Sequence, residues 1–324
     1  MITSRLYRFG NLYCRFLIPV TRIGLPVYHD LLDAYRVHVI PDPGEVLTVD
    51  MNCEETAVID SDSGNADITS TKNYAQTLRE ERIQYLKMSV QRTGDDCLDW
   101  ILEDTENGEH LLRFRLSADR RKISLEEDHT DTGGCFAFAW LSNLLPYAAA
   151  ERRMLTFHGV LLEYRNLGIV ISAPSGTGKT THARLWRDLK GAHIINGDNA
   201  VCVMNEGIWH GCGVPWSGSS GEQIAASVPI KAMVVLERGS SNHCRQITGF
   251  EAFHAAYENT VCERWDRHHL DVILSLLEQF LQDVPVYRLS CLPDADAVET
   301  LYRAIFRKEN ESEVRIEGVH GEEP

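Results

Sequence analysis

An almost purely apolar run, residues 168–172, leads directly into a glycine-rich segment, residues 173–180, and then into a helical stretch, residues 181–189. A run without polar residues is typical of a central strand that is covered on both faces of its sheet. A strand, a glycine-rich loop and a helix in this order form the setting of a P-loop. This arrangement constrains the fold most, because it requires a layered α/β domain with the strand inside it.

The loop has the chemistry that a triphosphate requires. Gly176 and Gly178 let backbone N–H groups turn inward, and the following helix adds its positive N-terminal end. Lys179 is placed to reach the β- and γ-phosphates, and the Thr180 hydroxyl to bind Mg²⁺. We therefore predict that ATP or another nucleoside triphosphate binds together with Mg²⁺. The predicted nucleotide-binding residues are Ser175, Gly176, Thr177, Gly178, Lys179, Thr180 and Thr181.

One position departs from the motif G-x-x-x-x-G-K-[ST], because Ala173 stands where the first Gly is usual. If that position required a positive φ, Ala would cost about 1–2 kcal/mol. The departure affects the expected shape of the loop and leaves Lys179 and Thr180 unchanged. Without a nucleotide, Lys179 is expected to face solvent. The alternative interpretation is a glycine-rich turn with a solvated lysine and no phosphate site, which the flanking strand and helix disfavour.

Two acidic residues are candidates for the metal or for proton transfer. The segment 192–198, shortly after the loop helix, is a strand-like run that ends in Asp198, and we expect this residue to face the phosphates. There it would hold Mg²⁺ or its water, or take the proton from an attacking hydroxyl. The alternative is an Asx turn at Asp198-Asn199. Glu237, after the apolar run 233–236, is either a Walker-B-like acid or a surface residue, so the predicted metal ligands are Thr180, Asp198 and Glu237.

Three short motifs together resemble a known superfamily. They are Phe157-His158-Gly159, then Ser175-Gly176-Thr177-Gly178-Lys179-Thr180-Thr181, then Asn196-Gly197-Asp198-Asn199. The combination looks like the HPr serine kinase/phosphorylase and phosphoenolpyruvate carboxykinase superfamily. It is most similar to the HPr-kinase-like proteins of modified-peptide pathways, including those that phosphorylate serine on lasso-peptide precursors. The resemblance covers about residues 136–307.

The resemblance implies a role for each matched residue. Lys179 and Thr180 would bind the triphosphate and Mg²⁺, His158 would lie near the transferred phosphate, and Asp198 would act as base or metal ligand. The predicted catalytic residues are accordingly Asp198, His158 and Lys179. Those families usually show two adjacent acids, whereas this chain has Asp198-Asn199. One carboxylate role is therefore missing here or supplied by another residue.

The first part of the chain shows a pattern of short strands in place of alternating strands and helices. Short strand-like runs are joined by turns without a long helix between them, which predicts an antiparallel sheet. The runs are residues 35–40, 56–59, 83–88, 98–102 and 110–116. We expect an antiparallel β-rich domain over residues 1–134, a mixed-sheet P-loop kinase core over 135–307, and an acidic disordered tail over 308–324. The fold class is α/β.

Within the second domain we expect a buried helix over 136–150 that bends near Pro146, followed by strands at 155–162 and 168–172. Further strands are expected at 193–196, 200–204, 208–212, 231–236 and 286–289. Helices are expected at 249–261, 266–283 and 294–307. The first of these three helices should begin at a capping box formed by Thr248 and Glu251.

Charge and cysteine usage narrow the partners and the compartment. The formal net charge of −15 argues against nucleic acid and anionic membranes, which require clustered Lys and Arg. The nine cysteines are dispersed and include no C-x-x-C pair, as expected in a reducing compartment. No apolar run approaches the roughly 20 residues needed to span a bilayer. We therefore expect a cytoplasmic protein with no membrane or nucleic-acid partner, and leave a homo-oligomer open.

The leading functional hypothesis is a kinase that uses ATP and Mg²⁺ to phosphorylate a Ser or Thr hydroxyl on a peptide or small protein. Residues 213–222, rich in Gly and Ser around Trp216, are either an acceptor loop near the site or an ordinary surface loop. A nucleotide-binding regulatory module with slow turnover is the alternative that the Asp198-Asn199 departure favours. A small-molecule kinase would share the nucleotide site and differ in its acceptor.

Overall fold

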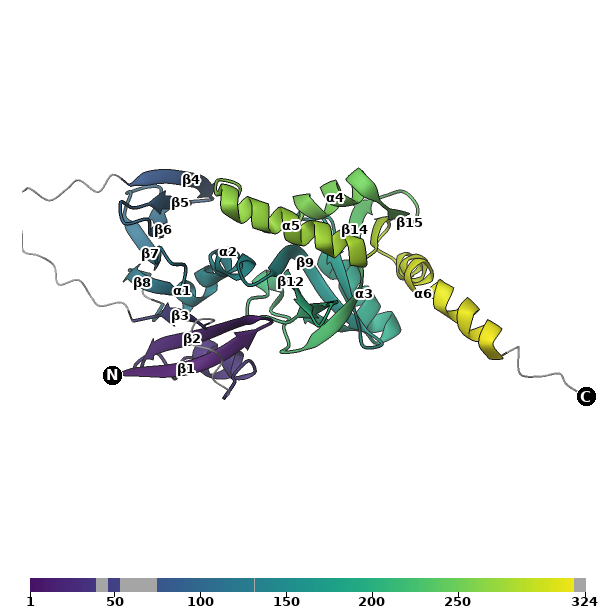
Figure 1. The fold of residues 1–324 in the computed structure, drawn as a ribbon, viewed down its shortest axis with the longest axis horizontal. Coiled ribbons are helices and arrows are strands. Elements are labelled where there is room, and N and C mark those ends of the chain that lie inside the picture. The colour runs from purple at the N-terminus through teal and green to yellow at the C-terminus, as the bar shows by residue number, and fades with distance from the viewer. Residues whose placement is uncertain (39–45, 53–74, 131, 318–324) are drawn as a thin grey trace, which may run out of the picture. The chain divides into compact units, whose positions relative to one another are not determined.

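The computed structural model describes residues 1–38, 46–52, 75–130 and 132–317, with the side chains of residues 29 and 307–317 excepted. The chain divides into two compact units, Met1–Ala148 and Ala149–Pro324. Each unit is built on its own sheet (Figure 1). Residues 135–148, which were expected to belong to the C-terminal domain, fall in the first unit.

The first unit contains a β-rich, mostly antiparallel sheet of eight strands in the order β1-β2-β3-β8-β7-β6-β5-β4. Among the strand pairs that the structure describes in this unit, β2–β3 and β3–β8 are parallel and the others antiparallel. The strands are β1 (Ile2–Phe9), β2 (Leu12–Pro19), β3 (Val46–Asp50), β4 (Gln76–Ile83), β5 (Leu86–Arg92), β6 (Leu98–Asp104), β7 (His110–Leu116) and β8 (Lys122–Asp128). Along β2 every second residue is buried, which is the pattern of a strand with one face on a core.

Helical segments complete this unit: a π-helix (Val27–Leu31), α1 (Cys135–Trp140), a 3-10 turn (Leu141–Asn143) and the start of α2 (Leu145–Ala150). Phe138 of α1 packs against Phe16 and Tyr28, and Tyr147 of α2 packs against Trp100. These aromatic contacts explain why residues 135–148 join the first unit. The helix expected over 136–150 is divided by the 3-10 turn, just before Pro146.

Some of the expected strands are present and others are not. The runs 98–102 and 110–116 lie in β6 and β7. The run 83–88 instead spans the turn between β4 and β5, where Gln84 adopts a positive φ of 57° without a glycine to signal it. In the run 35–40, Arg36 forms only an isolated bridge to Tyr7. The run 56–59 lies outside the described residues.

The second unit is a mixed α/β structure on another sheet of eight strands. Its elements are β9 (Met154–Tyr164), β10 (Leu167–Ser172), α3 (Lys179–Lys190), β11 (His193–Asn196), β12 (Asn199–Asn205), β13 (Ile208–Cys212), a 3-10 turn (Gly218–Ser220), β14 (Ser227–Arg238), β15 (His243–Ile247), α4 (Gly249–Glu258), α5 (Arg267–Asp283), β16 (Val286–Cys291) and α6 (Ala295–Glu317). The expected elements are all present, and β15 is an addition.

Two long strands hold this sheet together. The first half of β9, up to His158, pairs with β12, and its second half, from Gly159, pairs with β10 and β11. In the same way β14 pairs with β13 at its start and with β10 and β16 farther on. The sheet therefore forks at the middle of β9.

Helices cover both faces of the sheet (Figure 1). Residues of α4 and α5 share one core cluster with β9, β12 and β14, and residues of α3 and α6 share another with β10. Along β10, Val170 belongs to the first cluster, while Ile169 and Ile171 belong to the second. Both faces of β10 are therefore buried, as its apolar sequence predicts.

Two helix ends differ from expectation. At α4, Thr248 is the N-cap residue, but its side chain makes no capping hydrogen bond, and Glu251 pairs with Arg245 and Arg288 instead. The last helix, α6, continues to Glu317, so residues 308–317 are helical where a disordered tail was expected. Lys, Glu and Arg in this stretch are good helix formers, which accounts for the continuation. Residues 318–324 lie outside the described part.

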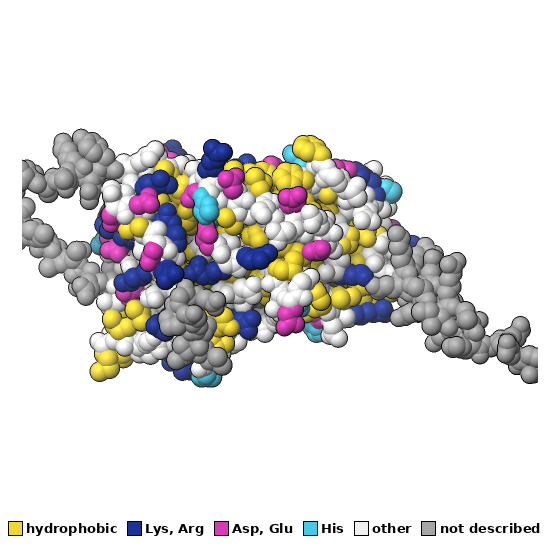
Figure 2. Space-filling view, in the orientation of Figure 1, with side chains coloured by type: hydrophobic (Ala, Val, Ile, Leu, Met, Phe, Trp, Pro, Cys, Tyr) yellow, Lys and Arg dark blue, Asp and Glu magenta, His cyan; other side chains and the backbone are white. Residues whose placement is uncertain are grey.

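The surface mixes both signs of charge. On the face shown in Figure 2, acidic and basic side chains are intermingled. None of the eight cysteines among the described residues forms a disulfide. Of the helices in the described ranges, none is both long and apolar enough to cross a membrane.

Candidate functional site

The glycine-rich segment connects β10 to α3. Gly176 and Gly178 have φ values of 75° and 113°, which side chains rarely tolerate, so glycine is required at both positions. Gly178 is the N-cap residue of α3. Ala173 is fully buried and is not among the residues with positive φ, so it carries no strain at the position where the motif usually has glycine.

Lys179, the first residue of α3, is turned back over this loop. Its Nζ donates to the Ala173 carbonyl oxygen at 2.9 Å and lies 3.1 Å from Nε2 of His158. Only 9% of the residue is exposed. The expectation of a solvent-facing lysine is therefore wrong, because the side chain is buried and its ammonium group contacts two protein atoms. Burial lowers the pKa of Lys179, and the charge of Asp198 opposes that shift.

His158 stands where β9 changes partners. The next residue, Gly159, must be glycine, because a Cβ there would lie 2.7 Å from the Ile171 carbonyl oxygen of β10. The His158 carbonyl accepts from the Ser172 hydroxyl at 2.6 Å, and its N–H donates to the Asn259 carbonyl at 2.8 Å. The backbone is thus held on both sides. The position of the imidazole follows from the fork in the sheet.

The imidazole lies between a cation and a carboxylate. Its Nδ1 is 3.5 Å from Oδ1 of Asp198, on the side opposite Lys179. Because the ammonium of Lys179 can only donate, Nε2 of His158 accepts and Nδ1 carries the hydrogen. Burial and the positive charge of Lys179 lower the pKa of His158, and Asp198 raises it. The structure therefore brings the three predicted catalytic residues into one row, with His158 as a neutral imidazole.

The turn that carries Asp198 is held by Asn196, for which the sequence predicted no role of its own. The fully buried side chain of Asn196 accepts hydrogen bonds from the backbone N–H groups of Asp198 and Asn199, at 3.0 and 2.8 Å. Its amide donates to the carbonyl oxygens of Val214 and Trp216, at 2.9 and 3.0 Å. The side chain that forms this turn thus belongs to Asn196 rather than to Asp198. Only its place at the end of an apolar run hinted at this role.

The segment 213–222 lies against this turn. The Asn199 amide donates to the Trp216 carbonyl oxygen at 3.0 Å, and the Gly197 N–H donates to the Glu222 carbonyl oxygen at 2.9 Å. A Cβ at Gly218 would lie 2.5 Å from a carboxylate oxygen of Asp198. The segment is therefore next to the row of Lys179, His158 and Asp198. Its expected role as an acceptor loop stays a prediction.

Ion pairs connect the same segment to α3. The carboxylate of Glu222 pairs with Arg184 at 3.1 Å and with Arg187 at 3.0 Å. The third arginine near the loop, Arg238, donates to the Gly176 carbonyl oxygen. All three arginines therefore already have protein partners.

Glu237 does not join the row of catalytic candidates. It lies near the end of β14, and its carboxylate pairs with Arg288 of the neighbouring strand β16. Arg288 also lies 3.1 Å from Glu251. A carboxylate bound to an arginine is poorly placed to bind a cation, so the surface interpretation of Glu237 gains support from its partner.

The metal site stays a prediction. Among the described residues, no group of three or more His, Cys, Asp and Glu side chains is arranged to hold a metal ion. Mg²⁺ in nucleotide sites usually has one or two protein ligands and completes its shell with phosphate oxygens and water. Thr180, the second residue of α3, and Asp198 remain the candidate ligands.

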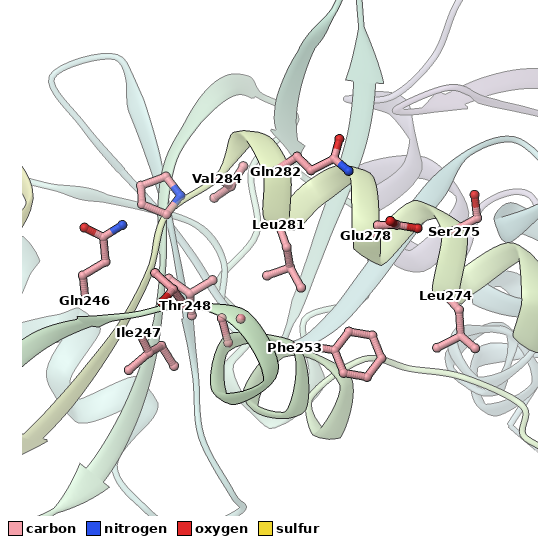
Figure 3. A pocket seen from close by; sticks show the side chains of 14 residues that line it. Gln246, Ile247, Thr248, Phe253, Leu274, Ser275, Glu278, Leu281, Gln282 and Val284 are labelled. Carbon is pink, nitrogen blue, oxygen red and sulfur yellow. The ribbon is translucent and has the colours of Figure 1, made fainter.

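Two pockets flank β16. One, of about 410 Å³, borders the glycine-rich loop and includes Gly176, Thr177 and Arg238. The other, of about 790 Å³, is lined by α4, α5 and the start of β16, and Figure 3 shows Phe253 and Leu281 among its side chains. The larger pocket lies at the opposite end of the strand and contains no residue of the loop. The smaller pocket is the one that borders the loop, through Gly176, Thr177 and Gly178.

Comparisons with known proteins add little. No family model matches the chain, and no curated protein matches it. Among solved structures, the HPr(Ser) kinase/phosphatase from Coxiella burnetii is similar to this chain over about half its length. The match has a TM-score of 0.32 and 11% sequence identity, and covers 51% of this chain and 99% of that chain. A likeness at this level does not identify an activity.

Proposed function

We propose that this protein is a P-loop kinase that transfers the γ-phosphoryl group of ATP, or of another nucleoside triphosphate, to a hydroxyl group of a peptide or small protein. The observation that carries the proposal is the row of Lys179, His158 and Asp198 beside a glycine-rich loop with an open helix N-terminus. Phosphoryl transfer consists mostly of positioning and charge neutralisation, and this arrangement supplies groups for both.

The triphosphate would bind along residues 173–180. Backbone N–H groups of the loop and the first turn of α3 provide donors, and the helix end favours negative charge. Lys179 would leave His158 and the Ala173 carbonyl to contact the β- and γ-phosphates. Both of its present partners are neutral, so a phosphate oxygen offers the ammonium a stronger, charge-assisted bond.

Release of Lys179 would open His158 to the acceptor. With Nδ1 protonated toward Asp198, the free Nε2 can accept the proton of an attacking hydroxyl. The bond from the hydroxyl oxygen to the γ-phosphorus forms as the bond to the β-phosphate oxygen breaks, and the proton moves to Nε2. Asp198 then stabilises the imidazolium. The separation of 3.5 Å between Nδ1 and Asp198 is long, as catalytic contacts often are before substrate binds.

Mg²⁺ would be bound by the hydroxyl of Thr180 and a carboxylate oxygen of Asp198. The fit rests on Asp198, whose side chain is 34% exposed, so that an oxygen remains free beside His158. When bound, the ion would neutralise charge on the β- and γ-phosphates.

The class of acceptor is argued from what surrounds the row. A small charged metabolite usually requires paired Arg or Lys in a compact pocket, and Arg184, Arg187 and Arg238 are each bound to protein atoms. The Gly- and Ser-rich segment 213–222 offers backbone groups near Asp198. The resemblance of the motifs to HPr-kinase-like proteins is the reason for proposing that the acceptor is a hydroxyl group of a peptide. A metabolite kinase would use the same nucleotide site.

A regulatory nucleotide-binding module with slow turnover is the second candidate. One observation favours it: the Asn199 amide is used to hold the Trp216 carbonyl, so the turn provides a single carboxylate, that of Asp198. Base and metal roles would then compete for Asp198 unless His158 takes the proton.

The proposal is tested by incubating the full chain with Mg²⁺ and γ-labelled ATP in the presence of Ser- and Thr-containing peptides encoded near its gene. A panel of metabolites is tested in parallel. We expect phosphoserine or phosphothreonine on at least one peptide, and far less of it with Asp198→Asn. Label on a metabolite with every peptide unmodified would exclude the peptide acceptor, and ATP binding without any transfer would favour the regulatory module.

A further inference from the structure

The smaller pocket has two chemically different walls. One consists of the glycine-rich loop and the first turn of α3, including Thr177 and Thr181. The other comes from the carboxyl ends of β14 and β16 and is mostly apolar, with Leu236, Leu292 and Pro293. A volume of about 410 Å³ falls within the range of small-molecule sites. An apolar wall facing polar backbone suits a flat ring with a polar edge.

Two polar side chains at this pocket, Arg238 and His182, are placed to contact a bound ligand. The exposed guanidinium of Arg238 stands at its edge, bound to the Gly176 carbonyl oxygen, and guanidinium groups stack well on aromatic faces. His182 also lines the pocket and is 3% exposed. Its Nε2 accepts from the Trp186 indole, so Nδ1 carries a hydrogen for which the described residues offer no acceptor.

The position of the pocket in the sheet determines which way a bound nucleotide would point. In the order β9, β10, β14, β16, the loop follows β10 at the centre. His158 comes from β9 on one side, and the pocket is built from β14 and β16 on the other. An in-line transfer requires the acceptor and the leaving group on opposite sides of the transferred phosphoryl group. A nucleoside in this pocket would leave the γ-phosphate directed toward His158 and Asp198.

We propose that this pocket binds the base and ribose of the nucleoside triphosphate, with Arg238 against the base and the triphosphate extending from it along the loop. The inference rests on the proposed function, because it assumes that phosphates occupy the loop. It adds that the nucleoside itself is recognised, at a place built by Leu236, Leu292 and Pro293.

The test compares the better of ATP and GTP with inorganic tripolyphosphate, each with Mg²⁺, in equilibrium binding to the full chain. Tripolyphosphate has the same three phosphorus atoms and no nucleoside. We expect the nucleotide to bind at least about tenfold more tightly than tripolyphosphate. Leu292→Trp, which fills the pocket, and Leu292→Ala, which removes apolar wall, should each remove most of that advantage and leave tripolyphosphate affinity unchanged.

Leu292 is 40% exposed, so both variants should fold, and a melting curve checks this. The matched control is Leu189→Ala, an exposed leucine of α3 that does not line the pocket. Equal affinities for nucleotide and tripolyphosphate in the unmodified protein, or equal loss of both in the Leu292 variants, would overturn this inference alone. Failure of the unmodified protein to bind either ligand would overturn the proposed function and this inference with it.

Discussion

The side-chain amide of Asn196, which is fully buried, donates a hydrogen bond of 3.0 Å to the backbone carbonyl oxygen of Trp216. The same side chain accepts from the N–H groups of Asp198 and Asn199. One buried residue therefore sets the position of the acidic turn and of the segment 213–222 together.

Replacing Asn196 should destabilise the second unit. Asn196→Ala leaves the Val214 carbonyl oxygen and the N–H groups of Asp198 and Asn199 without their partner, whereas the Trp216 carbonyl oxygen keeps its bond from Asn199. Each group left unpaired costs about 1–3 kcal/mol. We expect a loss of roughly 3 kcal/mol or more in the free energy of unfolding, measured by urea denaturation. The control Asn205→Ala, at the exposed end of β12, should change stability by less than about 0.5 kcal/mol. A loss below about 1 kcal/mol in the Asn196 variant would show that the turn does not depend on this side chain.

Asp198→Asn tests the carboxylate. The variant keeps the size of the side chain and the Asn196 turn, and removes the charge that orients His158 and binds Mg²⁺. We expect phosphoryl transfer to fall by a factor of roughly a hundred or more with a much smaller loss of ATP affinity, because the interaction acts mainly in the transition state. Asp188→Asn, at an exposed position of α3, is the control. Near-normal transfer by the Asp198 variant would move the acidic role to another residue.

Acid should destabilise the protein through His182. Burial lowers the pKa of His182 to about 4 from the usual 6.5. Between these values the unfolded chain binds a proton that the folded chain does not, so stability falls as pH drops below 6.5. The loss attributable to this group is roughly 2 kcal/mol between pH 7 and pH 5.

His182→Gln provides the comparison, since glutamine keeps an acceptor for the Trp186 indole but does not titrate. Urea denaturation at the two pH values should show a smaller acid-induced loss in the variant than in the unmodified protein. His193→Gln, at a side chain that is 71% exposed, should behave like the unmodified protein. Identical pH dependence in the His182 variant would mean that its imidazole does not stay neutral in the folded state.

Much of the second unit was predictable, because its elements are long and strongly patterned. The apolar run before the loop predicted a strand that is covered on both faces, and Val170 and Ile171 indeed face different core clusters. Lys179 and Asp198 were expected at the phosphates from the residues themselves, but His158 only through a family resemblance, since its position depends on the change of partner strand between His158 and Gly159 of β9. No local pattern encodes a fork.

Other features depended on contacts that a sequence pattern does not show. The capping box at Thr248 failed because Glu251 pairs with Arg245 of the preceding strand β15 and with Arg288 of β16. The turn at Gln84 was missed because its positive φ is adopted by a residue other than glycine. Lys179 was expected in solvent, but the Ala173 carbonyl and the imidazole of His158 are close enough to bury it.

The central claim is that Lys179 leaves its present partners to bind the phosphates of a nucleotide, and MgATP affinity tests it most directly. Titration calorimetry should be run on the unmodified protein, on Lys179→Met, which keeps most of the side chain without its charge, and on Lys190→Met, a control at the other end of α3. Loss of a charge-assisted contact is worth about 1.5–3 kcal/mol, so affinity should fall by roughly tenfold to more than a hundredfold in the Lys179 variant only. Unchanged MgATP affinity in a folded Lys179→Met protein would contradict the account.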